Sequence, residues 1–473
     1  MTNLSGINLN NGSAVGSKRE GMDSPSKGLA LMPRYEAYKD SYSDYSGLIP
    51  CEWKLIPIRA IFEERNEKNT GPKTDHILSV TRDRGVIPYD EKGAIGNNKS
   101  EDIERYKLVY ENDLVINKMN VVIGSLGLSK YFGALSQVYI VLRPKTKSFN
   151  IRYYAYLFHN EPFYKSLIRY CTGIMELRES LNKEQFKQLY LPFPTFEEQT
   201  LIANFLDKKT AQIDDAIAIK EQQISLLKER KQIIIQQAVT QGLDPNVPMK
   251  DYGVDWIGKI PAHWDCAKLK YYIDILPGYA FKSEQYSLKE SDIKLLRGIN
   301  VSPDLVKWEE VVYWPSSKIK GLEKYDMQVG DLVIAMDRPW VSSGIRVAEI
   351  SKKDLPCMLL QRVGRIRGNG GSLTSYIKLL LSTNLFLSYF EPMLTGISVP
   401  HISSDQIEDF RTPIPPLQEQ REILDFVNRQ TNYFDHAIES TLQQIEKLKE
   451  YKTTLINSAV TGKIKITPEM VEQ

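Results

Sequence analysis

Apolar residues recur at steps of three and four positions along two long stretches of the chain, with polar and charged residues between them. This spacing places the apolar side chains on one face of an α-helix and is typical of a coiled-coil seam. It predicts helices over residues 197–240 and 418–461, each about 60 Å long at about 1.5 Å per residue. Gly242 and Gly462 follow these stretches, as glycine commonly does at helix ends. The seam residues are Ile202, Leu206, Ile213, Ile217, Ile224, Leu227, Ile234 and Ala238, and Ile423, Val427, Phe434, Ile438, Ile445, Leu448, Leu455 and Ala459.

Shorter patterns fill the rest of the chain. ENDLVINKM at 111–119 and VGDLVIAMD at 329–337 each predict a turn followed by a short apolar strand. SQVYIVLRP and LQRVGRIRG each place a glutamine before an alternating strand, whereas residues 151–170 and 373–391 have helical spacing. Since Gly, Asn and Pro separate these runs, we expect two mixed α and β domains.

The chain is a tandem repeat. Aligned without a gap, the two helical stretches are identical at about 19 of 44 positions. The pattern Asp-aromatic-x-Gly-x-Ile-Pro-x-x-Trp occurs at residues 44–53 and again at 255–264, and we call these the lead segments. A lead segment, a mixed domain, a proline-rich hinge and a long helix therefore follow one another twice.

A long helix with one apolar seam needs a partner. Each helix can pack against its own domain, or the two copies can pair with each other, and we favour pairing. Because each helix leaves one domain and runs toward the other, the pair is then antiparallel and the lead segments lie beside the helix ends. The predicted fold class is α+β: two mixed α/β domains joined by a long antiparallel two-helix coiled coil, pseudo-twofold from the duplication.

These patterns divide the chain into six predicted segments. The N-terminus is rich in Ser, Gly and Asn, a composition typical of a disordered tail. The predicted segments are a disordered tail over 1–37, a first domain over 38–196, a first helical region over 197–247, a second domain over 248–416, a second helical region over 417–464 and a C-terminal tail over 465–473.

Composition narrows the class of protein. No run of about 18 apolar residues occurs and the N-terminus has no apolar signal-peptide core, so we expect a cytoplasmic protein without a membrane span. Cys51, Cys171, Cys266 and Cys357 form no CxxC pair and are predicted to be free, buried thiols. The net charge of +2 means that bulk charge alone does not drive the chain onto nucleic acid, although local basic faces remain open.

Motifs of catalysis and cofactor binding are missing from the sequence. We find no GxxxxGK[ST] loop, no GxGxxG after a strand, and no Asn- or Asp-Pro-Pro-aromatic loop of the kind expected in an adenine methyltransferase. The carboxylates of PYDEK at 88–92 lack the spread that a two-metal nuclease needs, and this stretch is predicted to be a solvated turn. We therefore expect no catalytic residue, cofactor or metal site in this chain.

The duplicated hinge with EEQ or QEQ, the helix ending in AVT and the duplicated lead segment resemble the specificity subunit of type I restriction-modification enzymes, from Tyr38 onward. The resemblance implies two target recognition domains, two conserved helical regions and no catalytic activity. It also implies that the helices hold two methyltransferase subunits, which use S-adenosylmethionine to methylate adenine N6. Motor-nuclease restriction subunits, with ATP and Mg as their cofactors, then join to cut unmethylated DNA. The first lead segment departs slightly, with DYSG where the second has DWIG.

A physical argument agrees with this resemblance. Two different reading domains on a rigid spacer read two half-sites of double-stranded DNA that are separated by an unread gap. The domains diverge because they read different bases, and the helices stay alike because both grip copies of one partner. Since a target adenine must leave the base stack to be methylated, we expect the methyltransferase partner to flip it.

The family places base reading in loops of the recognition domains. Arginine can hold guanine, and asparagine can hold adenine, through two hydrogen bonds, whereas lysine mostly contacts phosphate. Trp340 is a candidate wedge beside DNA, with core packing as the favoured role. The predicted DNA contacts are Arg82, Arg84, Lys118, Asn120, Ser125 and Lys130 in the first domain and Arg297, Asn300, Arg338, Ser342, Arg346 and Arg362 in the second.

Two other functions are compatible with the residues. In the first, the chain is an adaptor whose two domains bind proteins and whose helices only space them. In the second, it is an enzyme with an unrecognised active site, which the missing catalytic pairs disfavour. Steep loss of DNA affinity with salt distinguishes DNA binding from the adaptor function, because phosphate contacts release counterions.

Overall fold

The computed structural model describes residues 29–93, 102–172, 180–254, 256–342, 344–394 and 400–472. It contains two compact units. Unit 1 comprises Met1–Glu221 and Leu442–Gln473, and unit 2 comprises Gln222–Thr441. Each unit holds one mixed α/β domain and a stretch of both long helices, α6 (Phe196–Gln241) and α10 (Leu417–Val460).

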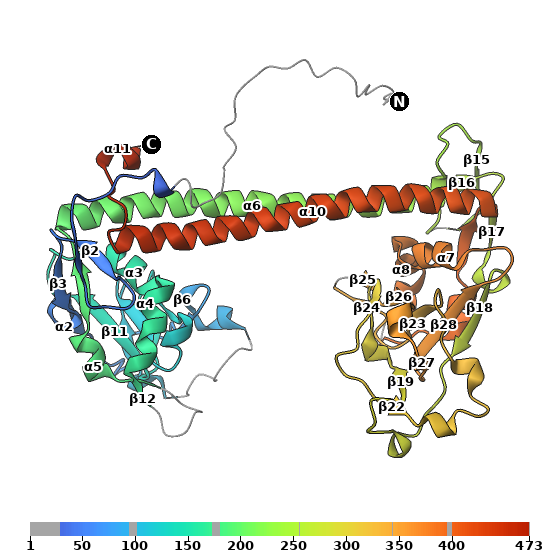
Figure 1. Ribbon diagram of the computed structural model, residues 1–473, viewed down its shortest axis with the longest axis horizontal. Helices are drawn as coiled ribbons and strands as arrows, with labels where there is room; N and C mark the ends of the chain where they lie inside the picture. Colours follow the sequence, from blue (N-terminus) through green and yellow to red (C-terminus); the bar gives the residue numbers. More distant parts are fainter. Residues whose placement is uncertain are drawn as a thin grey trace. The chain divides into compact units, whose positions relative to one another are not determined.

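Unit 1 is built on a four-stranded antiparallel sheet (Figure 1). Its strands, in spatial order, are β4 (Phe62–Glu64), β11 (Tyr139–Pro144), β8 (Leu114–Asn117) and β9 (Leu126–Leu128). Helix α3 (Ile151–His159) contacts β9 and buries its aromatic face, including Tyr153 and Phe158, in the core. The hydrophobic spacing of residues 151–170 predicted a helical stretch, and α3 is the first helix within it.

Smaller elements surround this sheet. The other strands of unit 1 are β1 (Tyr38–Asp40), β2 (Leu48–Pro50), β3 (Lys54–Pro57), β5 (Leu78–Thr81), β6 (Gly85–Pro88), β7 (Lys107–Val109), β10 (Gly133–Leu135), β12 (Cys171–Thr172), β13 (Ser180–Leu181) and β14 (Tyr190–Phe193). Its other α-helices are α2 (Ile58–Ile61), α4 (Glu161–Ser166), α5 (Lys183–Gln188) and α11 (Pro468–Glu472).

Unit 2 contains a four-stranded antiparallel sheet of the same plan. Its strands are β18 (Ile273–Pro277), β28 (Val363–Gly368), β23 (Leu332–Ala335) and β26 (Val347–Glu349). A three-stranded sheet adds β22 (Tyr313–Trp314), β19 (Ile293–Leu296) and β27 (Cys357–Leu359), in which β19 and β27 are parallel. The remaining elements are β15 (Met249–Asp251), β16 (Lys259–Pro261), β17 (Asp265–Lys268), β20 (Val301–Ser302), β21 (Leu305–Val306), β24 (Trp340–Val341), β25 (Gly344–Ile345), β29 (Arg411–Ile414), α7 (Thr374–Leu381), α8 (Asn384–Phe390) and α9 (Ser404–Glu408).

The register of the sheets identifies equivalent residues in the two domains. Leu114 of β8 pairs with Leu142 of β11, and Leu332 of β23 pairs with Ile366 of β28. The aspartate before each central strand, Asp113 or Asp331, is buried and accepts the backbone N–H of the residue three positions earlier. The duplication thus extends into domains whose sequences match only in outline.

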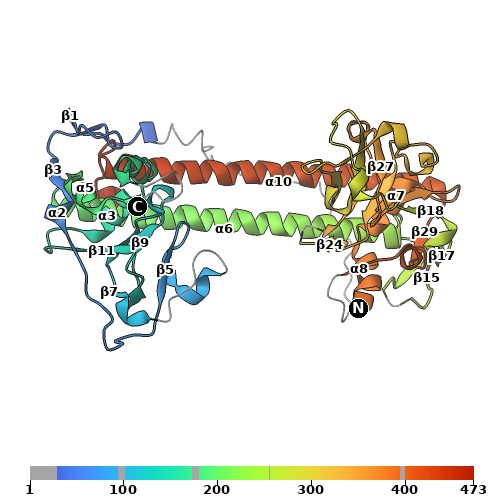
Figure 2. The same ribbon diagram turned by 90° about the horizontal axis from the view of Figure 1, so that it is seen from below.

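The two long helices contact each other within each unit. In unit 1, α6 and α10 lie side by side (Figure 2). Lys452 there lies 2.7 Å from Asp214, and Lys220 donates to Gln444. Residue numbers rise on α6 as they fall on α10, so the helices run antiparallel there. In unit 2, Lys231 lies 2.7 Å from Asp435.

Most predicted seam residues are buried or half-buried. In unit 1, Leu206 and Leu455 belong to one core, and in unit 2, Ala238 and Ile423 belong to another. The first seam is displaced by one residue near its end, where Ile235 rather than Ile234 is fully buried. A straight helix has 3.6 residues per turn, so a pattern of three- and four-residue steps drifts around it and favours different neighbours along its length.

The lead segments lie beside helix ends, as expected. In unit 1, Gly462 follows α10 and packs against Trp53, and in unit 2, Gly242 follows α6 and packs against Trp264. Both glycines have φ of +72°, a left-handed conformation that glycine adopts without steric cost and that commonly ends helices. This contact explains why glycine and tryptophan recur together.

The Glu-Gln pair at each hinge also has a structural reason. Gln199 donates to the Pro194 carbonyl and accepts the Asn150 N–H, and Gln420 donates to the Pro415 carbonyl and accepts the Leu373 N–H. Each buried glutamine thereby ties its hinge to the helical layer of its own domain. The adjacent glutamates accept from aromatic side chains, Glu198 from Tyr35 and Glu419 from Trp264.

The prediction of a disordered tail over 1–37 is wrong for residues 29–37. Leu29 and Tyr35 are buried in the core of unit 1, and Tyr35 packs edge-on against Trp53. The Lys465 N–H donates to the Pro33 carbonyl and fixes residues 29–37 to the segment that follows α10. Polar residues before and after it concealed these two apolar anchors. Residues 1–28 lie outside the described residues.

The four cysteines are thiols rather than disulfides, as expected, but the prediction that all are buried is wrong. Cys357 is buried on β27, and burial raises the pKa of its thiol to about 12. Cys51 is exposed in the turn after β2, and Cys171 and Cys266 are half-buried. Within the described ranges, no helix is long and apolar enough to cross a membrane, and no cluster of three or more His, Cys, Asp or Glu side chains is suited to a metal ion.

Candidate nucleic-acid interface

The predicted contact residues of unit 1 gather partly at one edge of its sheet. Lys118 and Asn120 follow the central strand β8, and the exposed Arg82 and Arg84 form the turn between β5 and β6. Gly127 of β9 packs so closely on this hairpin that an added Cβ would lie 2.9 Å from the Gly85 Cα. The glycine therefore lets the hairpin pack closely on β9, the strand next to the central strand.

The side chains of Arg82 and Arg84 both remain largely accessible to solvent. The side chain of Arg82 is 68% exposed and lies 3.8 Å from Asp83, whereas Arg84 donates to the carbonyl oxygen of Glu91. Lys130 is exposed but follows β9 at the end opposite Ser125, about 17 Å along the extended chain at 3.3 Å per residue. The structure thus brings Arg82, Lys118 and Asn120 toward one edge and leaves Lys130 apart.

The equivalent edge of unit 2 carries two exposed arginines. Arg338 follows β23 and Arg362 precedes β28, and the Met336 N–H donates to the Arg362 carbonyl. Both arginines have positive φ, 46° and 69°, which is uncommon for residues other than glycine. Ser342 is exposed in the nearby turn between β24 and β25. Such strained backbone is held in place by surrounding bonds and concentrates at functional sites.

A histidine and an aspartate that the sequence analysis missed complete this edge. His401 Nδ1 lies 2.7 Å from Asp337 Oδ1, and Arg362 Nη1 lies 3.5 Å from the same oxygen. The Arg338 N–H donates to the Pro400 carbonyl, beside His401. Asp337 ends the VGDLVIAMD strand pattern, so its position was visible in the sequence, but no pattern pointed to His401.

Comparisons with known proteins agree with this architecture. The family model described as "Type I restriction modification DNA specificity domain" matches residues 50–229 and 309–450, more than half of the chain. This chain belongs to that family. Type I specificity subunits recognise DNA sequence and are not themselves enzymes, so the chain is a non-catalytic DNA-recognition subunit with two recognition domains.

Individual relatives point the same way. The type I restriction enzyme MjaVIII specificity subunit of Methanocaldococcus jannaschii is 26% identical over 435 residues, covering 90% of this chain and 97% of the relative. The EcoAI specificity subunit of Escherichia coli is 35% identical over 167 residues, covering 35% of this chain and 28% of the relative. The resemblance inferred from the duplicated motifs is therefore confirmed.

Solved structures share the fold. A chain from work on "complex assembly and conformational transition of the type I R-M system" has a TM-score of 0.64 at 12% identity, covering 87% of this chain and 98% of that chain. The HsdS subunit from Thermoanaerobacter tengcongensis has a TM-score of 0.50 at 14% identity, covering 88% and 98%. At such identities the similarity establishes the fold alone.

Four of the predicted contact residues in the recognition domains have side chains that are engaged internally in the structure. The buried Ser125 hydroxyl donates to the Val80 carbonyl, and the Asn300 side chain, 2% exposed as a residue, donates to the Lys307 carbonyl. The guanidinium of Arg346 donates to backbone carbonyls that include Val301, and burial lowers its pKa. Arg297 is half-buried and donates to the Glu310 carbonyl.

Trp340 takes the core role that the sequence analysis favoured over a wedge. Its ring lies 5.4 Å from the Phe386 ring and 6.0 Å from the Phe390 ring, centroid to centroid, and is nearly parallel to Phe390. The half-buried ring packs against the hydrophobic core of unit 2. The hairpin that starts at Trp340 is thereby anchored under the exposed Ser342 turn.

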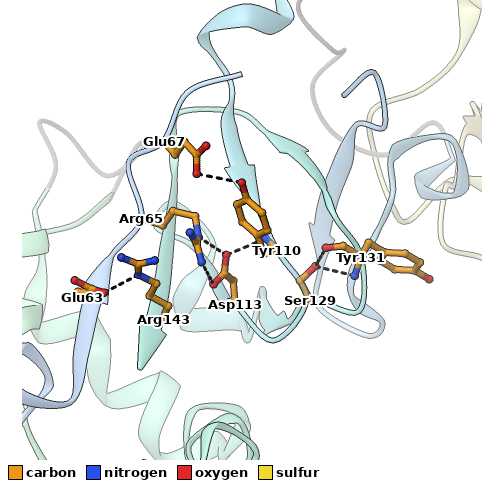
Figure 3. Close-up of polar contacts among 8 residues, drawn as sticks. All are labelled: Glu63, Arg65, Glu67, Tyr110, Asp113, Ser129, Tyr131 and Arg143. Carbon is orange, nitrogen blue, oxygen red and sulfur yellow. Dashed lines mark hydrogen bonds and ion pairs between the residues drawn. The ribbon is translucent and has the colours of Figure 1, made fainter. Parts of the chain in front are cut away.

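Another polar cluster in the first recognition domain is structural (Figure 3). Arg65 Nε lies 2.7 Å from Asp113 Oδ2, its Nη2 donates to Asp113 Oδ1, and its guanidinium lies 4.3 Å from the centre of the Tyr110 ring. The Asp113 side chain is 3% exposed and that of Arg65 is 15% exposed. In the second domain, the equivalent aspartate, Asp331, makes a bidentate pair with Arg367, which lies on β28.

Replacing Asp113 by alanine is expected to destabilise unit 1 by about 3–5 kcal/mol, because the largely buried Arg65 then keeps a charge without a partner. The matched control is Glu63→Ala, which breaks the surface pair with Arg143 and is expected to cost about 0–1 kcal/mol. Hydrogen exchange of peptides from β8 and β11 during urea titration measures unit 1 separately. Equal effects of the two substitutions would show that Asp113 has no special structural role.

Proposed function

We propose that this specificity subunit reads a bipartite DNA site, with each recognition domain reading one half. Its helices dock two methyltransferase subunits for adenine N6 methylation and recruit the restriction subunits. The observation that carries this proposal is the repetition of one sheet plan in both units, with different side chains at the same edge. One ancestral DNA-reading domain, duplicated and diverged, accounts for both features.

We also propose that α6 and α10 form one antiparallel coiled coil with pseudo-twofold symmetry. In the aligned repeat, Asp214 is equivalent to Asp435 and Lys231 is equivalent to Lys452. Unit 1 contains the Asp214–Lys452 ion pair and unit 2 contains the Lys231–Asp435 ion pair, each at 2.7 Å. The two ion pairs join equivalent residues with the roles of the two helices exchanged, which is the pattern that a duplicated antiparallel helix pair produces.

Apolar side chains on the helices support a docking role. Unit 1 exposes Ile219 of α6 and Leu442 of α10, at 64% and 50%, and unit 2 exposes Leu226 of α6 and Tyr433 of α10, at 64% and 68%. These residues lie outside the seam between the helices. Large apolar side chains exposed on both helices of each unit suit the docking of one partner helix on each, and hence two methyltransferase copies.

The cofactors belong to the partners in this proposal. S-adenosylmethionine binds the methyltransferase subunits, and ATP and Mg bind the restriction subunits. The methyltransferase extracts the target adenine from the duplex, while the recognition domains hold the flanking base pairs. This chain supplies position and sequence choice, which requires hydrogen-bonding and apolar groups at its surface rather than catalytic groups.

Salt dependence distinguishes this function from that of a protein-binding adaptor. For the complex of this chain with its methyltransferase subunits, raising salt from about 50 to 200 mM is expected to weaken DNA binding about a thousandfold or more if six or more phosphates are contacted. Fluorescence anisotropy with a labelled duplex measures this, and the methyltransferase subunits alone are the control. The adaptor function instead predicts that adding this chain leaves DNA affinity unchanged.

A further inference from the structure

The two recognition domains present different chemistry at one equivalent edge. Asn117 pairs with Tyr139 in unit 1 as Ala335 pairs with Val363 in unit 2, so the residues just beyond these pairs correspond. A further segment closes each edge, because the Leu181 N–H donates to the Lys118 carbonyl and the Ile402 N–H donates to the Met336 carbonyl. The equivalent pairs are Met119 with Asp337, Asn120 with Arg338, Val138 with Arg362 and Ser180 with His401. We call these four positions of each domain the reading edge.

In unit 2 the reading edge is charged. Arg338 is exposed and the Arg362 side chain is 60% exposed, and their backbones are fixed by hydrogen bonds to neighbouring loops. Asp337 holds the His401 ring and lies near the Arg362 guanidinium without burying either. Asp337 therefore positions Arg362 and His401, and the two arginines keep most of their donors available to a ligand.

In unit 1 the same edge carries no charged side chain at these four positions. Met119 is 42% exposed and Val138 is 39% exposed, and Ile123 in the adjoining loop is 50% exposed. Single exposed apolar residues are ordinary on protein surfaces. Here they gather in two loops at the place where the other domain carries its arginines, which a general tolerance for apolar surface does not explain.

We propose that the reading edges set which bases the two domains select. Arg338 and Arg362 in unit 2 select guanine through paired hydrogen bonds to its major-groove edge. Met119 and Val138 in unit 1 select thymine by contact with its methyl group, and Asn120 offers its amide to adenine. The inference rests on the proposed function and adds the class of base that each half-site contains.

The test for unit 2 uses lysine substitutions. Arg338→Lys and Arg362→Lys keep the charge but lose the planar fork that holds guanine. Single-molecule sequencing of N6-methyladenine, in a host carrying the chain and its methyltransferase, is expected to show one guanine of one half-site relaxed, between about fivefold and a hundredfold in discrimination. The other half-site stays unchanged and reports that the complex is assembled. Arg411→Lys, an exposed arginine on β29, is the matched control and leaves the motif unchanged.

The test for unit 1 removes a methyl group from DNA. Replacing thymine by uracil, one position at a time, is expected to weaken binding of the wild-type complex about fourfold at one thymine of the other half-site. The variant Met119→Ala with Val138→Ala loses this preference and binds both duplexes equally. A wild-type complex indifferent to every thymine methyl overturns the assignment for unit 1.

Failure of the inference and failure of the proposed function give different results. If both lysine variants keep the full motif while deletion of the gene abolishes methylation, the chain reads DNA but not through this edge. If methylation continues unchanged without the gene, the proposed function itself fails. Relaxation at a position that contains no guanine would also overturn the assignment for unit 2.

Discussion

Exchanging residues 45–190 for the corresponding segment of another specificity subunit is expected to change one half of the methylated motif completely and to spare the other. This segment carries the four-stranded sheet of unit 1 and the whole of its reading edge. It meets the helices through a few anchors, among them the Tyr153 hydroxyl, which donates to the Val460 carbonyl, and Asn160, which donates to Asn457. A donor segment that keeps these anchors brings its own reading surface.

The measurement is the N6-methyladenine motif of the exchanged chain with its methyltransferase. The matched control is the reciprocal exchange of residues 266–410 in unit 2, which is expected to change the other half only. If either exchange alters both halves, the two domains do not read independently and the division of labour proposed here is wrong.

Inserting seven residues at equivalent points of both helices is expected to lengthen the unread gap of the site by about three base pairs. Seven residues add about 10 Å of helix, and base pairs are about 3.4 Å apart. Seven residues are also close to two full turns, so the seam stays nearly aligned. Suitable points follow Glu221 and Leu442, which are equivalent in the repeat.

Control insertions distinguish helices that set the gap between the half-sites from helices that only hold the complex together. Two-residue insertions at the same two points turn the seam by about 200° around each helix and are expected to abolish methylation by disrupting helix pairing. Three added base pairs also rotate one half-site by about 100° around the duplex, so the methylation rate falls even when the longer gap is chosen. Active complexes that keep the original gap would show that the helices do not set the spacing.

The parts of this fold that the sequence predicted are those encoded locally. Helix periodicity is a short-range property, and the duplicated lead segments and hinges recur as complete motifs. The burial of Tyr35 was not predicted, because its partners, Trp53 and Glu198, come from separate parts of the chain. The order of strands in the sheet was not predicted for the same reason, since β11 pairs with both β4 and β8, which are distant from it in the sequence.

Residue type alone does not separate accessible candidate residues from those whose side chains are engaged inside the domain. Arg338 and Arg346 are chemically alike in the sequence, yet the first is exposed and the second donates to several backbone carbonyls. Asn300 suits adenine as a free amide, but it closes a turn inside unit 2. His401 had no motif to mark it. Which polar groups are free for DNA is decided by tertiary partners, which a single sequence does not display.

The most direct test of the central claim is single-molecule sequencing of N6-methyladenine in a methylation-free host. The host carries the neighbouring methyltransferase gene with this gene, and in parallel the methyltransferase gene without it. We expect a split motif with an unread gap that appears only when this chain is present. An active methyltransferase that marks the same sites without this chain would contradict DNA reading by the two recognition domains.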